Sequence, residues 1–246
     1  MSDRPSAPLD YAERWMLDGM RVLRPSFAAL QVTVDMTQAM LRIKELRKQG
    51  VRATTTHLLV RATARALAQN PALHQLIAGT RRYRPARVDI GLSVAGDTFV
   101  APVLVIEAAD QKSVAEIVTE FAHRVPEVRE ADRKMMAALR RFGWLAPFGF
   151  LRRAILRLLF TSGTFRRKGA GTFQVSTVPG DWALTSSFST GGVLMGGQVW
   201  QRVVAVDGQP AVRPVMTLTL SGDHGVFDGR SGAKLLSVVK AELEAV

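Results

Sequence analysis

The stretch that decides the fold is residues 215–243, VMTLTLSGDHGVFDGRSGAKLLSVVKAEL. Met216, Leu218 and Leu220 alternate with polar residues, so Val215–Ser221 is predicted to be a β-strand with one wet face. A glycine-containing loop follows, and from about Ser231 the apolar residues recur at the spacing of a helix. The stretch therefore predicts a strand, a loop and a closing helix in immediate succession.

The rest of the chain interleaves strands and helices in the same way. Strands are predicted at 27–36, 88–94, 99–106, 172–176 and 193–206, and helices at 37–49, 56–69 and 113–125. Ser113 is the predicted N-cap of the last of these helices, with Glu116 at the capping-box position. This order favours an α/β two-layer sandwich, a mixed sheet flanked by helices. The alternating strands leave one sheet face solvated or covered by something other than helices.

Composition limits the function classes. The 246 residues are 47% hydrophobic, enough for one well-filled domain. The absence of cysteine excludes disulfides, thiolate metal sites and a cysteine nucleophile, and no metal site is expected. The net charge of +12 favours anionic partners, but no nucleic-acid-binding motif accompanies it, so no nucleic-acid partner is expected. Residues 1–10 are interpreted as a flexible polar leader without an apolar signal region, and a cytoplasmic protein is expected.

The loop after the last predicted strand carries the candidate chemistry. His224 stands at a strand end between glycines, where an imidazole can accept a proton near neutral pH. Asp228, four residues later, either fixes this loop or serves only as the N-cap of the final helix. A histidine in a loop is also compatible with a structural or merely exposed role. The pattern of residues alone does not require an enzyme.

A resemblance extends the interpretation. His224, Asp228 and Gly229 match the HxxxDG signature of the chloramphenicol acetyltransferases and of the acyltransferase cores of 2-oxo-acid dehydrogenase complexes. Upstream segments resemble successive parts of these cores in the same order: VTVDMTQAMLRIKELRKQG, HLLVRATARALAQNPAL, VDIGLSVAGDTFVAPVLVIEAADQKSVAEI and GTFQVSTV. The chain thus resembles a stand-alone form of this catalytic core over most of its length.

The resemblance implies an acyltransferase with coenzyme A as co-substrate. His224 would be the general base that deprotonates the acceptor, which attacks the acyl thioester directly. Ser176 would donate to the oxyanion, with Thr177 as the neighbouring alternative. Taken alone, Ser176 is an ordinary strand-end serine. The motif aspartate of the family is mainly structural, so Asp228 would support the loop. The family assembles as trimers with the active site between subunits, so His224 and Ser176 would come from different chains.

Three departures affect the biological role. Gly225 replaces the arginine that often follows the motif histidine in the complex cores, which weakens the case for the same thiol acceptor. No lipoyl or subunit-binding domain is recognised, so one catalytic domain over 1–246 is expected. Residues 135–168 are interpreted as a basic, apolar helical insertion. Three readings of its segment 142–160 compete: a buried helix or lid, a surface for a membrane or lipid-like acceptor, and a surface for an acidic acyl-carrier protein.

The main expectation is therefore transfer from an acyl thioester to a small or lipid-like hydroxyl, amine or thiol, in a trimer or a larger multiple. The first alternative is the core of a dihydrolipoamide acyltransferase that uses lipoyl domains of another chain. The second is a non-catalytic scaffold or membrane-surface adaptor of the same fold. Acyl chain length and acceptor identity are not determined by the sequence.

Overall fold

One long strand, β9 (Gln209–Asp223), organises the chain in the computed structural model. It pairs antiparallel with β1 (Phe27–Asp35), β7 (Gly192–Gly196) and β8 (Trp200–Val206). The structure describes residues 11–22, 27–94, 101–143, 148–186 and 189–245, apart from the side chains of residues 13, 16, 17, 20 and 21. The strand predicted at 215–221 is the central part of β9.

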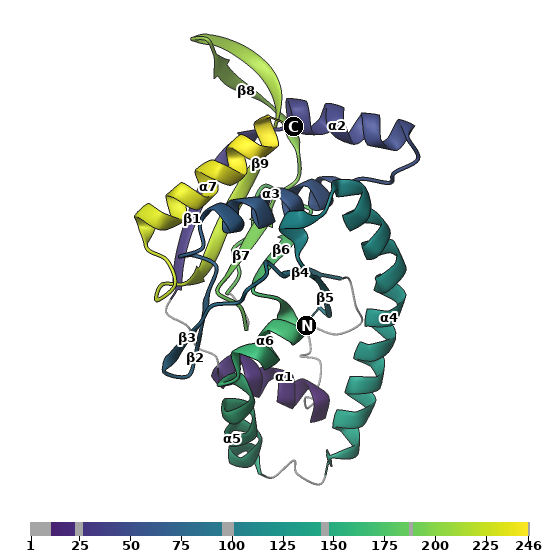
Figure 1. Cartoon of the computed structure of the whole chain (residues 1–246), viewed down its shortest axis with the longest axis vertical. Helices are drawn as coiled ribbons and strands as arrows, with labels where there is room; N and C mark the ends of the chain where they lie inside the picture. The colour runs from purple at the N-terminus through teal and green to yellow at the C-terminus, as the bar shows by residue number, and fades with distance from the viewer. Residues whose placement is uncertain (1–10, 23–26, 95–100, 144–147, 187–188, 246) are drawn as a thin grey trace, which may run out of the picture.

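The main sheet is mixed. Its strand order is β1-β9-β7-β6-β4-β5, with β8 pairing the first half of β9 and projecting beyond the sheet (Figure 1). Strand β6 (Phe173–Thr177) runs parallel to both neighbours, β7 and β4 (Ile90–Ser93), and β5 (Val103–Ile106) is antiparallel to β4. The predicted strand pair at 88–94 and 99–106 is thus confirmed in shorter form; the turn predicted at 95–97 lies outside the described residues.

Helices cover one face of this sheet. Figure 1 shows α3 and α7 crossing it side by side, with α4 at its flank and α1, α5 and α6 below. The helices are α1 Tyr11–Val22, α2 Thr37–Lys48, α3 Thr55–Gln69, α4 Val114–Arg141, α5 Gly149–Phe160, α6 Gly163–Ala170 and α7 Gly229–Glu244, with a 3-10 turn at Ala109–Gln111. Met216, Leu218 and Leu220 of β9 lie fully buried beneath this helical layer. The predicted two-layer α/β sandwich with a mixed sheet is confirmed.

Helix α4 continues well beyond its predicted end. Its capping box forms as expected: the Ser113 hydroxyl accepts from the Glu116 N–H at 3.2 Å, and the Glu116 carboxylate accepts in return. The predicted helix ends at Val125, and the next residue, Pro126, removes a donor and crowds the preceding turn. It continues to Arg141 because strong helix formers follow, Glu130 pairs with residues one turn later, and Met136 is buried.

The strand predicted at 193–206 is two strands. It is broken after Gly196, and the next glycine lies so close to the 180–181 loop that a Cβ there would be 2.1 Å from the Asp181 carbonyl oxygen. Only glycine allows this approach. The prediction also missed α1 and the small hairpin of β2 (Leu76–Ala78) and β3 (Arg81–Tyr83), whose three-residue strands are too short to show a periodicity.

Candidate functional site

The motif loop leaves β9 at Asp223 and presents His224 to solvent. The Nδ1 atom of His224 lies 3.1 Å from the Phe227 carbonyl oxygen. A carbonyl oxygen can only accept, so this contact requires the ring proton on Nδ1. The other ring nitrogen, Nε2, is then unprotonated in the neutral imidazole and can take a proton. This is the state that a general base needs.

Backbone and side-chain bonds fix the loop on both sides of the histidine. The Asp223 carboxylate accepts from the Gly225 N–H at 2.9 Å, and the Asp223 carbonyl oxygen accepts from the Val226 N–H at 2.8 Å. Val226 and Phe227 are buried in the core. The imidazole therefore projects from an anchored turn and is held in one orientation.

Asp228 caps the final helix. Its carboxylate accepts from the Ser231 N–H at 2.8 Å and from the Ser231 hydroxyl at 2.7 Å, and its own N–H donates back to that hydroxyl. The backbone hydrogen bond from Ser231 is the main cause that lowers the pKa of Asp228 from its ordinary value. The N-cap that the sequence offered as one of two roles is present, and it ties the end of the motif loop to the first turn of α7.

The β2–β3 hairpin supports the motif loop from outside. The Arg82 guanidinium donates to the Gly225 carbonyl oxygen at 2.9 Å. A Cβ on Gly225 would lie 2.6 Å from Ile77 Cδ1, so a side chain here would displace the hairpin. The glycine that departs from the family pattern thus makes room for Ile77. Ile77 and Arg82 show no periodic signal in the sequence, because the hairpin strands are only three residues long.

Arg166 connects the insertion to the same region. It lies on α6, is buried, and donates to the Ser189 carbonyl oxygen at 2.9 Å and to the Ile77 carbonyl oxygen. Burial lowers the pKa of Arg166, and the negative charge of Asp223 opposes that shift. The insertion therefore supports both the β2 strand and the segment before β7.

Ser176 and Thr177 point to opposite faces of β6. The Thr177 hydroxyl faces the helices and lies 2.9 Å from the Thr56 hydroxyl at the start of α3. Ser176, one residue earlier, is half-buried and faces the other side of the sheet. On that side the Ser221 hydroxyl donates to the Thr185 carbonyl oxygen at 2.6 Å, so part of this face is covered by a loop, not by a helix.

One chain does not bring Ser176 and His224 together. Across the sheet, Ser176 is the register partner of Met195, which in turn pairs with Thr219. His224 follows Thr219 by five residues along β9. With a rise of about 3.3 Å per residue and about 4.8 Å between strands, the two positions are on the order of 20 Å apart. A hydroxyl and an imidazole that act on one carbonyl group need far closer placement.

Within the described residues no group of three or more His, Asp or Glu side chains is arranged to hold a metal ion. None of the helices that the structure describes is long and apolar enough to cross a membrane.

Comparisons with known proteins connect this site to a family. A family model described as 2-oxoacid dehydrogenases acyltransferase (catalytic domain) matches residues 23–138 and 189–246. The matched stretches include the whole motif loop. Residues 139–188, with Ser176 and most of the predicted insertion, fall between them.

Two curated relatives illustrate the similarity in sequence. The dihydrolipoyllysine-residue succinyltransferase component of the 2-oxoglutarate dehydrogenase complex from Bartonella vinsonii is 32% identical over 86% of this chain and 46% of its own length. The lipoamide acyltransferase component of the branched-chain alpha-keto acid dehydrogenase complex from Bacillus subtilis is 26% identical over 80% of this chain and 41% of its own length. The chain thus spans less than half of each of these two relatives.

Two solved structures show the fold. A truncated catalytic core of the 2-oxoacid dehydrogenase multienzyme complex from Thermoplasma acidophilum superposes with a TM-score of 0.72, at 19% identity over 98% of both chains. A chloramphenicol acetyltransferase superposes with a TM-score of 0.52, at 15% identity over 97% of this chain and 95% of its own. The predicted chloramphenicol acetyltransferase-like fold is confirmed, and by the family match the chain belongs to the 2-oxoacid dehydrogenase acyltransferase (catalytic domain) family.

Proposed function

We propose that this protein transfers an acyl group between coenzyme A and a dihydrolipoyllysine thiol, with His224 as general base. The observation that carries the proposal is the His224 contact with the Phe227 carbonyl oxygen, which leaves Nε2 able to take a thiol proton. The names of the curated relatives favour this acceptor, which was the first alternative from the sequence, over a small hydroxyl or amine. Coenzyme A is the acyl carrier in this proposal, and no metal ion takes part.

The proposed reaction is direct. His224 Nε2 takes the proton of the attacking thiol, and the sulfur adds to the carbonyl carbon of the acyl thioester. The tetrahedral oxyanion accepts a hydrogen bond from the Ser176 hydroxyl. When the oxyanion collapses, the leaving thiolate takes the proton back from His224. One thioester is broken and one is formed, and no acyl-enzyme is needed.

We place His224 and Ser176 of one active site on neighbouring copies of the chain. The separation of on the order of 20 Å within a chain supports this arrangement. A closed ring of three copies forms three equal sites of this kind, so a homotrimer is the proposed unit. Asp228 supports each site by holding the end of the motif loop on α7. The catalytic domain of this proposal covers the whole chain, with residues 135–168 as its insertion.

A second candidate reaction differs only in the acceptor. Gly225 stands where the complex cores often carry an arginine, and Ile77 occupies the space beside it. This change in the residues beside His224 favours an acceptor other than dihydrolipoamide, such as a small hydroxyl or amine. Both candidates use the same base and the same acyl donor.

The test separates the two acceptors. Purified protein is incubated with acetyl- or succinyl-CoA and either dihydrolipoamide or a panel of alcohols and amines, and free CoA and the acylated product are separated by chromatography. Acylation of dihydrolipoamide that vanishes in His224→Ala supports the main proposal. Acylation of an alcohol or amine alone supports the second candidate. Absence of transfer to every acceptor by a correctly assembled protein contradicts both.

A further inference from the structure

Helix α5 is attached to the protein by a side that carries Arg152 together with the half-buried Leu156 and Phe160. Arg152 is the buried residue of this helix, and its Nε donates to the buried carboxylate of Asp18 on α1 at 3.1 Å. Its guanidinium also lies 5.4 Å from the centre of the Tyr11 ring. An ordinary surface helix turns its apolar stripe to the core, whereas most apolar residues of α5 lie on its exposed side. This orientation does not support the interpretation of 142–160 as a buried helix or a lid.

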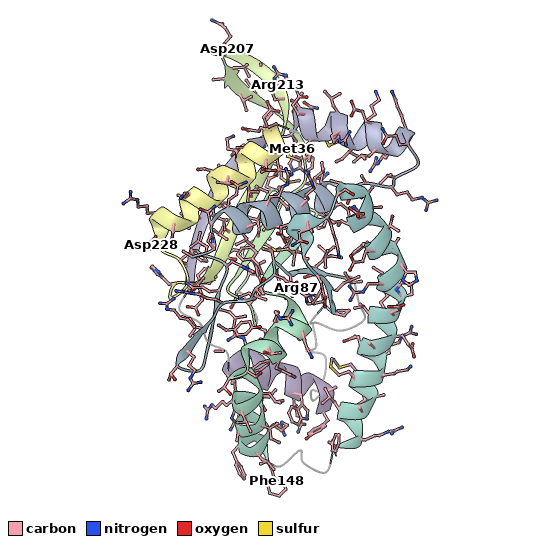
Figure 2. The ribbon with its side chains drawn as sticks, in the orientation of Figure 1. Met36, Arg87, Phe148, Asp207, Arg213 and Asp228 are labelled. Atoms are coloured by element: carbon pink, nitrogen blue, oxygen red, sulfur yellow. The ribbon has the colours of Figure 1, made fainter. Side chains whose placement is uncertain are left out.

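The apolar side of α5 is consequently exposed to water. Leu158 is 74% exposed and Phe150 67%. The outward apolar residues of the helix and its N-cap are Phe148, Phe150, Leu151, Ile155, Leu158 and Leu159; we call this set the α5 face. Figure 2 shows Phe148 at one tip of the molecule, opposite Asp207 in the turn between β8 and β9. Contiguous exposed apolar residues of this kind mark a docking surface.

The surrounding charge identifies the class of partner. Residues 133–180 contain ten lysines and arginines and no aspartate or glutamate; Arg152 and Arg167 pair with aspartates elsewhere in the chain and Arg166 is buried, which leaves seven. Arg157 is exposed at the edge of the α5 face, and Arg153 is partly exposed. Two copies that met through the α5 face would bring these positive charges together. The partner must therefore combine negative charge with an apolar layer.

We propose that the α5 face docks on an anionic lipid membrane. An amphipathic helix with basic flanks lies in the plane of such a membrane, with its apolar residues inserted by about 5–10 Å among the acyl chains. A helix of 12 residues extends about 18 Å, long enough to lie along the surface. Because α5 is at the tip of the molecule, the docked protein leaves the motif loop at Asp228 uncovered (Figure 2). This inference does not depend on the proposed acceptor.

Co-sedimentation of the full chain with vesicles tests the proposal. The parent protein is expected to bind vesicles of phosphatidylcholine and phosphatidylglycerol in equal parts, and to bind pure phosphatidylcholine far less. Leu158→Asp is expected to weaken binding by about tenfold or more, because a charged side chain then replaces an inserted one. The matched control is Leu41→Asp on α2, at a leucine that is 51% exposed and lies outside the α5 face. It is expected to bind like the parent.

Several outcomes overturn the proposal. They are the absence of parental binding to the anionic vesicles, equal binding by Leu158→Asp, and equal weakening by Leu41→Asp. A smaller assembly for Leu158→Asp in size-exclusion chromatography would instead identify the α5 face as a contact between copies. If an acidic carrier protein captures the parent but not Leu158→Asp, and neither protein binds vesicles, the partner would instead belong to that protein class. Acyl transfer between soluble substrates, measured on the same samples, shows separately whether the enzymatic proposal holds.

Discussion

His224 is held in place by contacts within its own loop. The Phe227 carbonyl oxygen fixes the Nδ1 proton and the loop bonds of Asp223 fix the direction of the ring. Both contacts lie within four residues of the histidine, so the residues of the motif loop themselves produce this geometry.

Removal of the imidazole is expected to lower kcat by about 10²–10⁴-fold in His224→Ala, since a positioned base contributes that much. Acyl transfer from acyl-CoA measures the effect, and circular dichroism confirms the fold. The matched control is His123→Ala on α4, where the side chain is 78% exposed. A His224→Ala enzyme as active as this control would exclude His224 as the base.

The hydroxyl of Ser176 is expected to act on the oxyanion. Ser176→Ala should lower kcat by about 10²–10³-fold and leave the KM for acyl-CoA nearly unchanged, because the bond forms only in the transition state. Thr177→Val, which removes the hydroxyl that contacts Thr56, is the comparison and should keep most of the activity. The opposite ranking of the two variants would transfer the role to Thr177.

The cap at Asp228 makes part of the stability depend on pH. Its pKa is lower in the folded chain than its ordinary value of 3.8, so the stabilisation is complete above that value and is lost as the pH falls through the folded pKa. Asp228→Ala should lower Tm at pH 7 by about 2–4 °C, and the difference from the parent should shrink toward pH 3. Asp228→Asn, which keeps a capping side chain, should stay close to the parent at pH 7. A Tm difference for Asp228→Ala that does not change with pH would contradict this account.

At the scale of elements, polar contacts of two arginines help to join the insertion to the rest of the fold. Arg152 of α5 pairs with Asp18 of α1, and Arg166 of α6 donates to carbonyl groups of β2 and of the segment before β7. Such contacts help to fix the orientation of a helix, and most apolar residues of α5 face outward.

Breaking the buried pair should unfold the insertion more easily. Arg152→Met leaves the Asp18 carboxylate buried, and the free energy of unfolding should fall by about 3 kcal/mol, the lower end of the usual range because Arg153 also lies 3.4 Å from that carboxylate. The double variant Asp18→Leu, Arg152→Met removes both charges and should recover most of this loss. Urea denaturation measures both. A double variant that is less stable than Arg152→Met would contradict the interpretation.

At the scale of the whole molecule, the proposed active site is a property of the assembly. The sheet holds Ser176 and His224 apart in one chain, and the β8–β9 hairpin extends beyond the sheet at one end of the molecule (Figure 1). Closed assemblies with head-to-tail contacts can bring such positions together across each interface.

Mixed assemblies test this directly. When His224→Ala and Ser176→Ala chains are co-expressed in equal amounts, about a quarter of the sites between chains combine an intact histidine with an intact serine. Activity should therefore recover to about a quarter of the parental value, although each variant alone is nearly inactive. If both residues act within one chain, no mixed site is complete and activity stays at the level of the single variants.

The sequence by itself determined the features that depend on neighbouring residues. The alternation in 215–221 specified the second half of β9, the glycines and the motif specified the loop, and the Ser113 capping box specified the start of α4. These are local patterns with a fixed period or a fixed side-chain bond, so a single amino-acid sequence is enough to predict them. The HxxxDG motif in its ordered context also identified the family.

Only the tertiary structure decided the features that depend on residues far apart in the chain. It turned Thr177 toward α3 and Ser176 to the other face, placed Ile77 beside Gly225, and buried Arg152 against Asp18. The apolar period of α5 predicts a helix but not which side faces the protein, because that choice also depends on the contact of Arg152 with Asp18, 134 residues away in sequence. Such long-range pairings leave no periodic signal, and the orientation of each helix and hydroxyl follows from them.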